Sequence, residues 1–121
     1  MIGFILFAAA LSSSPSSNAD LRCGSRNDQS ERECFERLFA RADSELNSAY
    51  SKVRRQLDRT DRQTLLQTQR AWLRYRDGQC ALESSMNRGG TLEITSEVAC
   101  KARLTRDRTK QLTNYLAGIG N

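Results

Sequence analysis

The spacing of apolar residues after Asn27 is the feature that most constrains this fold. Between residues 35 and 57, apolar side chains recur every three or four positions for about six turns, which is the period of an α-helix with one buried face. Acidic residues come early in this segment and basic residues late, as the helix dipole favours. The pattern predicts a first helix over residues 28–57. Its buried face consists of Phe35, Leu38, Phe39, Ala42, Leu46, Ala49, Tyr50, Val53 and Leu57.

Two further helices are predicted downstream. Thr60 followed by Gln63 is a capping-box pattern, so the second helix is expected over residues 61–86. The segment 87–91 (NRGGT) combines a helix stop, a tight reversal and a new N-cap, and a third helix is expected over residues 91–116. The clearest stripe of this third helix is Cys100, Leu104, Arg108 and Leu112. The sequence therefore predicts an all-α fold, a small elongated antiparallel bundle of three helices.

The second helix carries polar residues on its predicted buried face. At about 100° per residue, one arc of this helix contains Leu65, Leu66, Gln69, Trp72, Leu73, Arg76 and Cys80. We expect Trp72 and Leu73 to lie in the core and Arg74 to face solvent. A buried guanidinium is costly without partners. Arg76 is therefore expected to bind groups on the first helix, drawn from Asp43, Asn47 and Tyr50, and an anion-binding role is the alternative.

Residues 1–19 have the composition of a secretory signal. They contain no Asp, Glu, Lys or Arg, and Ile2–Leu11 is an apolar run too short to span a bilayer. Ser17 and Ala19 supply the small residues that precede a signal-peptidase cut. We expect cleavage near Ala19, a mature domain of residues 20–121, and a periplasmic or secreted bacterial protein. No later segment is apolar enough for stable membrane insertion.

The four cysteines match this compartment. An even count in a small exported protein favours disulfides, whereas a zinc site would want closely spaced pairs, and none is closer than eleven residues. Cys80 lies about nine residues before the Gly-Gly turn and Cys100 about ten after it. In a helical hairpin rising about 1.5 Å per residue, the two stand at nearly the same height. Of the three pairings, we therefore expect Cys80–Cys100 and Cys23–Cys34.

The charges bear on partners and on chemistry. The chain has 19 basic residues, 14 acidic residues and no His, with a net charge of +5. Basic surfaces attract polyanions, but an exported protein rarely meets nucleic acid, so anionic envelope polymers are the expected electrostatic partners. A solvated Arg-rich surface is the alternative. No Ser-His-Asp or Cys-His set, metal-ligand spacing or phosphate-binding Gly loop occurs. We therefore predict no enzyme, no catalytic residue, no metal and no cofactor.

An ordered set of residues between 43 and 112 resembles a known family. The element Gln-x-x-Trp-x-x-Tyr-Arg-Asp-x-x-Cys runs from Gln69 to Cys80 and is followed by Gly-Gly-Thr and a further Cys. The structural signature comprises Asn47, Tyr50, Gln69, Trp72, Arg76, Asp77 and Arg108. Asp43, Leu46, Thr105 and Leu112 also belong to the ordered set. This set is similar to the LprI-type domain, named for a mycobacterial lysozyme inhibitor, over residues 23–112.

The resemblance implies an exported inhibitor that binds a lysozyme-like peptidoglycan hydrolase. A non-enzymatic module that binds anionic cell-wall polymers or another exported protein is the alternative. The expected contact surface is the turn Arg88, Gly89, Gly90 and Thr91, which in the alternative view only closes the hairpin. Because animal lysozymes are typically basic, a local acidic patch formed by Glu83, Glu93 and Glu97 would favour their approach. The sequence leaves the oligomeric state open.

Overall fold

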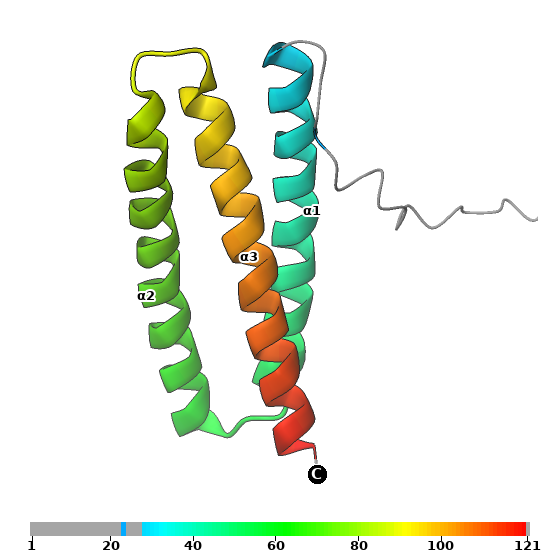
Figure 1. The fold of residues 1–121 in the computed structure, drawn as a ribbon. Helices are drawn as coiled ribbons and strands as arrows, with labels where there is room; N and C mark the ends of the chain where they lie inside the picture. The colour runs from blue at the N-terminus through cyan, green and yellow to red at the C-terminus, as the bar shows by residue number, and fades with distance from the viewer. Residues whose placement is uncertain (1–22, 24–27, 121) are drawn as a thin grey trace, which may run out of the picture.

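The computed structural model describes Cys23 and residues 28–120, which form three long α-helices (Figure 1). The helices are α1 (Asp28–Arg55), α2 (Arg59–Ser84) and α3 (Leu92–Ile119), and a short 3-10 turn, η2 (Ser85–Asn87), follows α2. No strand occurs in the described residues. Helices of 26 to 28 residues are about 40 Å long, so the molecule is elongated. The predicted all-α, antiparallel three-helix fold is confirmed.

The first helix begins where predicted, the other five helix ends shift by one to three residues, and one predicted cap is wrong. Asp58, not Thr60, is the N-cap of α2, because its carboxylate accepts a hydrogen bond of 2.8 Å from the backbone N–H of Asp61. The side chain of Arg62 closes the same turn by donating from Nε to the carbonyl of Arg54 at 2.9 Å. A backbone carbonyl at the end of α1 and a backbone N–H at the start of α2, which have no partner within their own helices, are thus both hydrogen-bonded within a very short connection.

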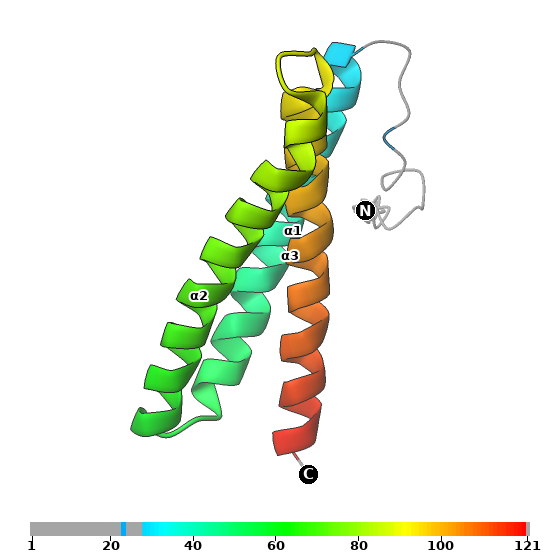
Figure 2. The same cartoon turned by 60° about the vertical axis from the view of Figure 1, so that its left-hand side comes forward.

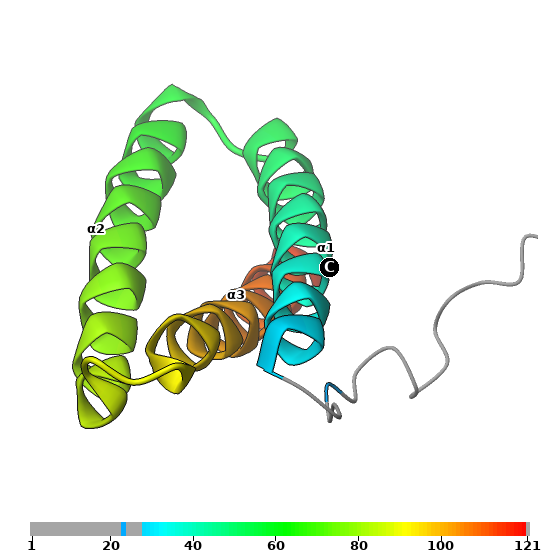
Figure 3. The ribbon, with the colours of Figure 1, turned by 90° about the horizontal axis from the view of Figure 1, so that it is seen from above.

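Helix α3 is the element that holds the bundle together. It packs closely along α1 and less extensively along α2, while α1 and α2 hardly approach each other. Figure 2 shows α2 leaning away from α3 with distance from the α2–α3 turn, and Figure 3 shows α1 and α2 standing apart with α3 along one side. The close approach of α3 follows from small buried side chains that allow backbones to come near. These are Thr95, Ala102 and Thr105.

The core lies where α1 and α3 meet. Its buried cluster is Leu46, Ala49, Val53, Leu65 and Leu112. The predicted buried face of the first helix is confirmed at Leu38, Ala42, Leu46, Ala49 and Val53. Its other members, Phe35, Phe39, Tyr50 and Leu57, are only partly buried. The third helix differs from its predicted stripe, since Leu104 and Arg108 are only partly buried while Thr105 is fully enclosed. Small and polar residues carry no hydropathy signal, so periodicity alone did not identify them.

The predicted core position of Leu73 is wrong. Its side chain is 36% exposed, because α1 does not come close enough to α2 to cover it. Trp72 is less buried than predicted, and it packs against the edge of the core. A helical wheel finds the residues that share a face, but the neighbouring helix decides how much of that face is covered.

Both predicted disulfides are confirmed. Cys80 and Cys100 are joined across the α2–α3 hairpin with a Cα–Cα separation of 5.4 Å, and both are buried. Cys23 is joined to Cys34 in the second turn of α1 with a Cα–Cα separation of 5.5 Å. The predicted signal segment and its cleavage near Ala19 lie outside the described residues. Within the residues that the structure describes, none of the helices combines the length and apolar character needed to cross a membrane.

Candidate functional site

The turn between α2 and α3 lies at one end of the bundle (Figure 1). We call residues 82–97 the tip. Gly89 has a φ of +77°, a left-handed conformation that glycine adopts without the strain of a Cβ. The N–H of Gly89 donates to the Glu93 carboxylate at 2.9 Å, and the N–H of Gly90 donates to the Asn87 carbonyl at 2.9 Å. The predicted tip residues Arg88, Gly89, Gly90 and Thr91 are all exposed, on a turn closed by its own hydrogen bonds.

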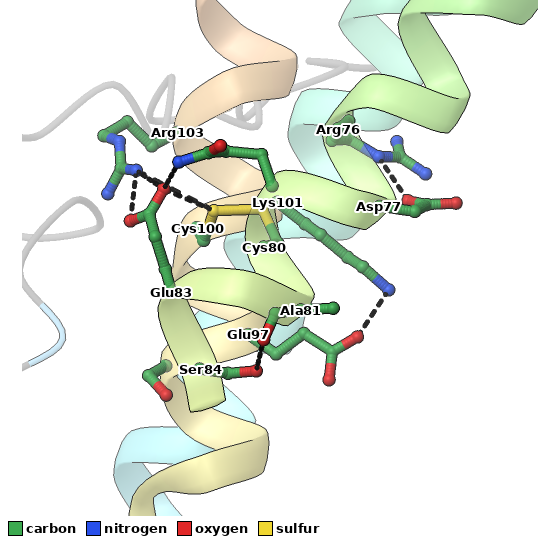
Figure 4. Close-up of a disulfide and its surroundings, with 12 residues drawn as sticks. Arg76, Asp77, Cys80, Ala81, Glu83, Ser84, Glu97, Cys100, Lys101 and Arg103 are labelled. Atoms are coloured by element: carbon green, nitrogen blue, oxygen red, sulfur yellow. Dashed lines mark hydrogen bonds and ion pairs between the residues drawn. A yellow bond between two sulfur atoms is a disulfide. The ribbon is translucent and has the colours of Figure 1, made fainter. Parts of the chain in front are cut away.

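The Cys80–Cys100 disulfide lies directly beneath the tip (Figure 4). Beside it, Arg103 Nη2 lies 2.9 Å from one oxygen of Glu83, and Gln79 Nε2 donates to the other oxygen at 3.0 Å. These hydrogen bonds lower the pKa of Glu83 below its ordinary value, and the bond from Gln79 has a larger effect than the bond from Arg103. The covalent bridge and the ionised carboxylate together fix the base of the tip.

Large apolar side chains surround this rigid turn. Leu82 is 66% exposed and Met86 is 88% exposed, and Leu92 and Ile94 on the α3 side are also exposed. The apolar periodicity of the sequence did not identify these residues as a surface. Leu82 and Met86 are four residues apart on α2 and η2 and lie outside the arc that predicts the buried face. That placement was the available signal, because several large apolar side chains exposed close together are typical of a binding surface.

A hollow of about 570 Å³ opens at the same end. Arg32 from the start of α1 lines it together with Gly89, Gly90, Thr91, Glu93, Ile94 and Thr95. The tip thus presents protruding apolar side chains next to a concave, mixed surface. Both features are typical of a protein-binding surface.

Arg76 lies at the centre of the signature residues and is buried as predicted, at 8% exposure. Its guanidinium lies over the ring of Phe39 at 5.1 Å and over the ring of Trp72 at 5.4 Å. Nη1 donates to Thr105 Oγ1 at 3.4 Å, and Nε lies 2.9 Å from a carboxylate oxygen of Asp77. The expected partners on α1, Asp43, Asn47 and Tyr50, are wrong: Arg76 bonds to Asp77 and Thr105, and the α1 side chain that it contacts is the ring of Phe39. Arg76 thus joins a structural network between α2, α3 and the Phe39 ring of α1.

Gln69 and Arg108 extend this network toward α3. Arg108 Nε donates to Gln69 Oε1 at 3.0 Å, and its guanidinium lies 6.0 Å from the centre of the Trp72 ring. Desolvation lowers the pKa of Arg108, but the group stays charged. Trp72 therefore contacts two cations, and the network fastens α2 to α3. Gln69 on α2 thus has a protein partner on α3.

Comparison with known proteins assigns the chain to a family. The family model described as lysozyme inhibitor LprI matches residues 23–112. The chain belongs to the LprI family. It is also similar to an uncharacterized protein of Rhizobium meliloti (strain 1021), with 35% identity over 101 residues and coverage of 73% of each chain. No solved structure matches it. Membership in the LprI family and the two disulfides are both typical of exported proteins.

The acidic residues at the tip of this LprI-family chain are largely satisfied by the chain itself. Glu83 pairs with Arg103, and Glu97 pairs with Lys101 at 3.1 Å (Figure 4). Glu93 accepts the hydrogen bond from the Gly89 N–H. The acidic patch expected from the sequence thus offers little unbalanced negative charge to a basic partner.

Asn47 and Tyr50, the signature residues on α1, lie apart from the network around Arg76. They line a groove between α1 and α2 that consists of two adjoining hollows of about 330 and 540 Å³. Tyr50 and Leu66 line both hollows. Among the described residues of this LprI-family chain, no group of three or more His, Cys, Asp and Glu side chains is placed to hold a metal ion.

Proposed function

We propose that this chain is an exported inhibitor of lysozyme-like peptidoglycan hydrolases, and that it binds the enzyme through the tip without being an enzyme itself. Family membership supports an inhibitor role. The observation that carries the choice of surface is the pair of exposed apolar side chains, Leu82 and Met86, beside a closed turn. We further propose export by cleavage near Ala19, with the mature domain acting in the periplasm or outside the cell.

The rigidity of the tip favours tight binding. A loop that is already held in one shape loses less conformational entropy when it binds. The tip is restricted by the disulfide at its base. It is also restricted by two hydrogen bonds, from the Gly89 N–H to the Glu93 carboxylate and from the Gly90 N–H to the Asn87 carbonyl. A narrow, convex end of a helical hairpin also suits the concave clefts in which enzymes bind substrates. Blocking such a cleft is the simplest way for a binding protein to inhibit.

Apolar contact, not charge attraction, drives the proposed association. The chain carries a net charge of +5, and the tip acids are engaged within the chain. A basic lysozyme and this protein therefore repel each other at long range. Because salt screens this repulsion, we expect the association rate with a basic lysozyme to rise as the ionic strength rises.

The experiment is a titration of hen egg-white lysozyme in a turbidity assay on bacterial cell walls. Met86→Asp places a charge at the most exposed apolar position of the tip, and we expect it to weaken inhibition at least about tenfold, as for a central interface residue. Ile119→Asp is the matched control, because Ile119 is an exposed apolar residue at the opposite end of α3. Equal inhibition by both variants would place the contact surface elsewhere.

The same assay separates the alternative functions. It is run with and without lysozyme at two salt concentrations. Inhibition of clearing supports the proposal. Wall binding that falls with salt, without inhibition, instead supports a module for anionic envelope polymers or another exported protein. Clearing by this protein alone would mean that it is an enzyme.

A further inference from the structure

The groove between α1 and α2 lies on the side of the bundle that α3 does not cover. Tyr50 and Leu66 line both of its hollows, and we call the apolar surface of these two side chains its floor. The larger hollow, of about 540 Å³, is also lined by three arginines, Arg54, Arg59 and Arg62. These come from the end of α1 and the start of α2, at the end of the molecule farthest from the tip (Figure 1).

The larger hollow has a net positive charge, because its three arginines outnumber the one carboxylate in its lining, that of Asp58. Within residues 28–120, none of them forms an ion pair. Arg62 uses Nε to bind the Arg54 carbonyl, and Asp58, which also lines the hollow, accepts the backbone N–H of Asp61. Residues 52–62 contain five basic and two acidic side chains. An anion in this hollow would thus meet several guanidinium groups at once, which is the arrangement that carboxylates and phosphates prefer.

Amide side chains also line the groove, together with the charged residues Asp43 and Arg70 in the smaller hollow. Gln63 lies among the arginines, and Asn47 and Gln69 line the adjoining hollow of about 330 Å³. A sugar ring has apolar faces that pack on aromatic and aliphatic side chains, and hydroxyl groups that bond to amides. An apolar floor with a few placed polar groups and cations therefore matches a chain of charged sugars.

We propose that the α1–α2 groove binds a linear acidic polysaccharide. The arginines bind its anionic groups, the floor around Tyr50 and Leu66 packs against its rings, and the amides bond to its hydroxyls. A bare polyphosphate would gain nothing from the apolar floor. A flat membrane surface would not reach the floor of a groove.

This site goes beyond the proposed inhibition and does not depend on it. The arginine-lined hollow of the groove and the tip lie at opposite ends of helices about 40 Å long. A chain bound to an envelope polysaccharide through the groove would keep its tip free for a protein partner. The protein would then be concentrated at the wall where hydrolases act.

The test measures binding of an oligogalacturonate, which carries one carboxylate on each ring, by isothermal titration calorimetry on the full mature chain. The variant is Arg54→Gln with Arg59→Gln, both exposed positions in helices. The control is Lys52→Gln with Arg55→Gln, which removes the same two charges from exposed positions that do not line the groove. We expect the groove variant to bind about tenfold more weakly or worse, and the control to change less than about threefold.

Two further ligands make the result specific. A neutral maltooligosaccharide of the same length should not bind measurably, because the arginines then have no partner. Linear polyphosphate should bind more weakly than the oligogalacturonate at equal charge. If both double variants lose affinity equally, or if polyphosphate binds as well as the acidic sugar, the basic end acts only as diffuse charge and the proposal is wrong.

Discussion

Replacing Arg76 tests most directly how this bundle holds together. The guanidinium lies between the rings of Phe39 and Trp72, at 5.1 and 5.4 Å from their centres. It donates to the hydroxyl of Thr105, a fully buried residue on α3. Its ion pair with Asp77 contributes little, because the Asp77 side chain is 54% exposed. The packing of the guanidinium between two rings is therefore the main stabilising contribution of this residue.

Arg76→Ala should destabilise the protein by about 3 kcal/mol. Two cation–π contacts contribute about 1 kcal/mol each, and two buried methylenes contribute about 0.8 kcal/mol each. Leaving Thr105 without this partner costs about another 1 kcal/mol. Part of this sum is offset, since the desolvation cost of the buried charge disappears. For a domain of this size, the loss corresponds to a fall in melting temperature of about 12 to 24 °C.

Two companion variants separate packing from charge. Arg76→Met keeps the methylene contacts and removes the buried charge, so we expect it to lie within about 1 kcal/mol of the parent. Arg74→Ala, at an exposed position of the same helix, should change the free energy of unfolding by less than about 0.5 kcal/mol. Urea unfolding followed by circular dichroism measures all three variants.

Either of two results would contradict this role of Arg76 in the stability of the bundle. If Arg76→Ala costs less than about 1 kcal/mol, the ring contacts do not fasten α2 to the rest of the bundle. If Arg76→Met is as damaging as Arg76→Ala, the charge itself is required and packing is not the main contribution.

Two other predictions concern the base of the tip. Replacing both Cys80 and Cys100 with Ala should lower the free energy of unfolding by about 3 kcal/mol, since the bridge spans 20 residues, and thermal unfolding of the oxidised parent and the variant measures this. Hydrogen bonds from Gln79 and Arg103 lower the pKa of Glu83 in the folded protein. The stability that Glu83 contributes is therefore complete above its pKa in the unfolded chain, and it is lost as the pH falls through its lower pKa in the folded protein. Glu83→Gln should therefore lose less stability than the parent as the pH falls below about 4.5. Urea titrations at several pH values measure the free energy of unfolding of both proteins. Identical pH profiles would contradict the assigned hydrogen bonds.

Local patterns in the sequence determined the elements of this fold. The three helices, their ends to within three residues and both disulfides were predicted. Helical period is a property of neighbouring residues, and the height of Cys80 and Cys100 in a hairpin depends only on their distance from the turn. The burial of Arg76 was predicted for the same reason, because its position on the apolar face is set by spacing along one helix.

The arrangement of the helices was decided only by the tertiary structure. Periodicity does not tell which helix covers a face or how closely it approaches. Helix α3, with the small side chains of Thr95, Ala102 and Thr105, comes near α1, whereas α1 and α2 stay apart. For this reason Leu73 is exposed, and a groove lies between α1 and α2. Arg76 donates a hydrogen bond to Thr105 on α3 and meets α1 at the ring of Phe39, not at the expected polar side chains. Close packing depends on the sizes of side chains on two facing surfaces, and those surfaces meet only in the folded chain.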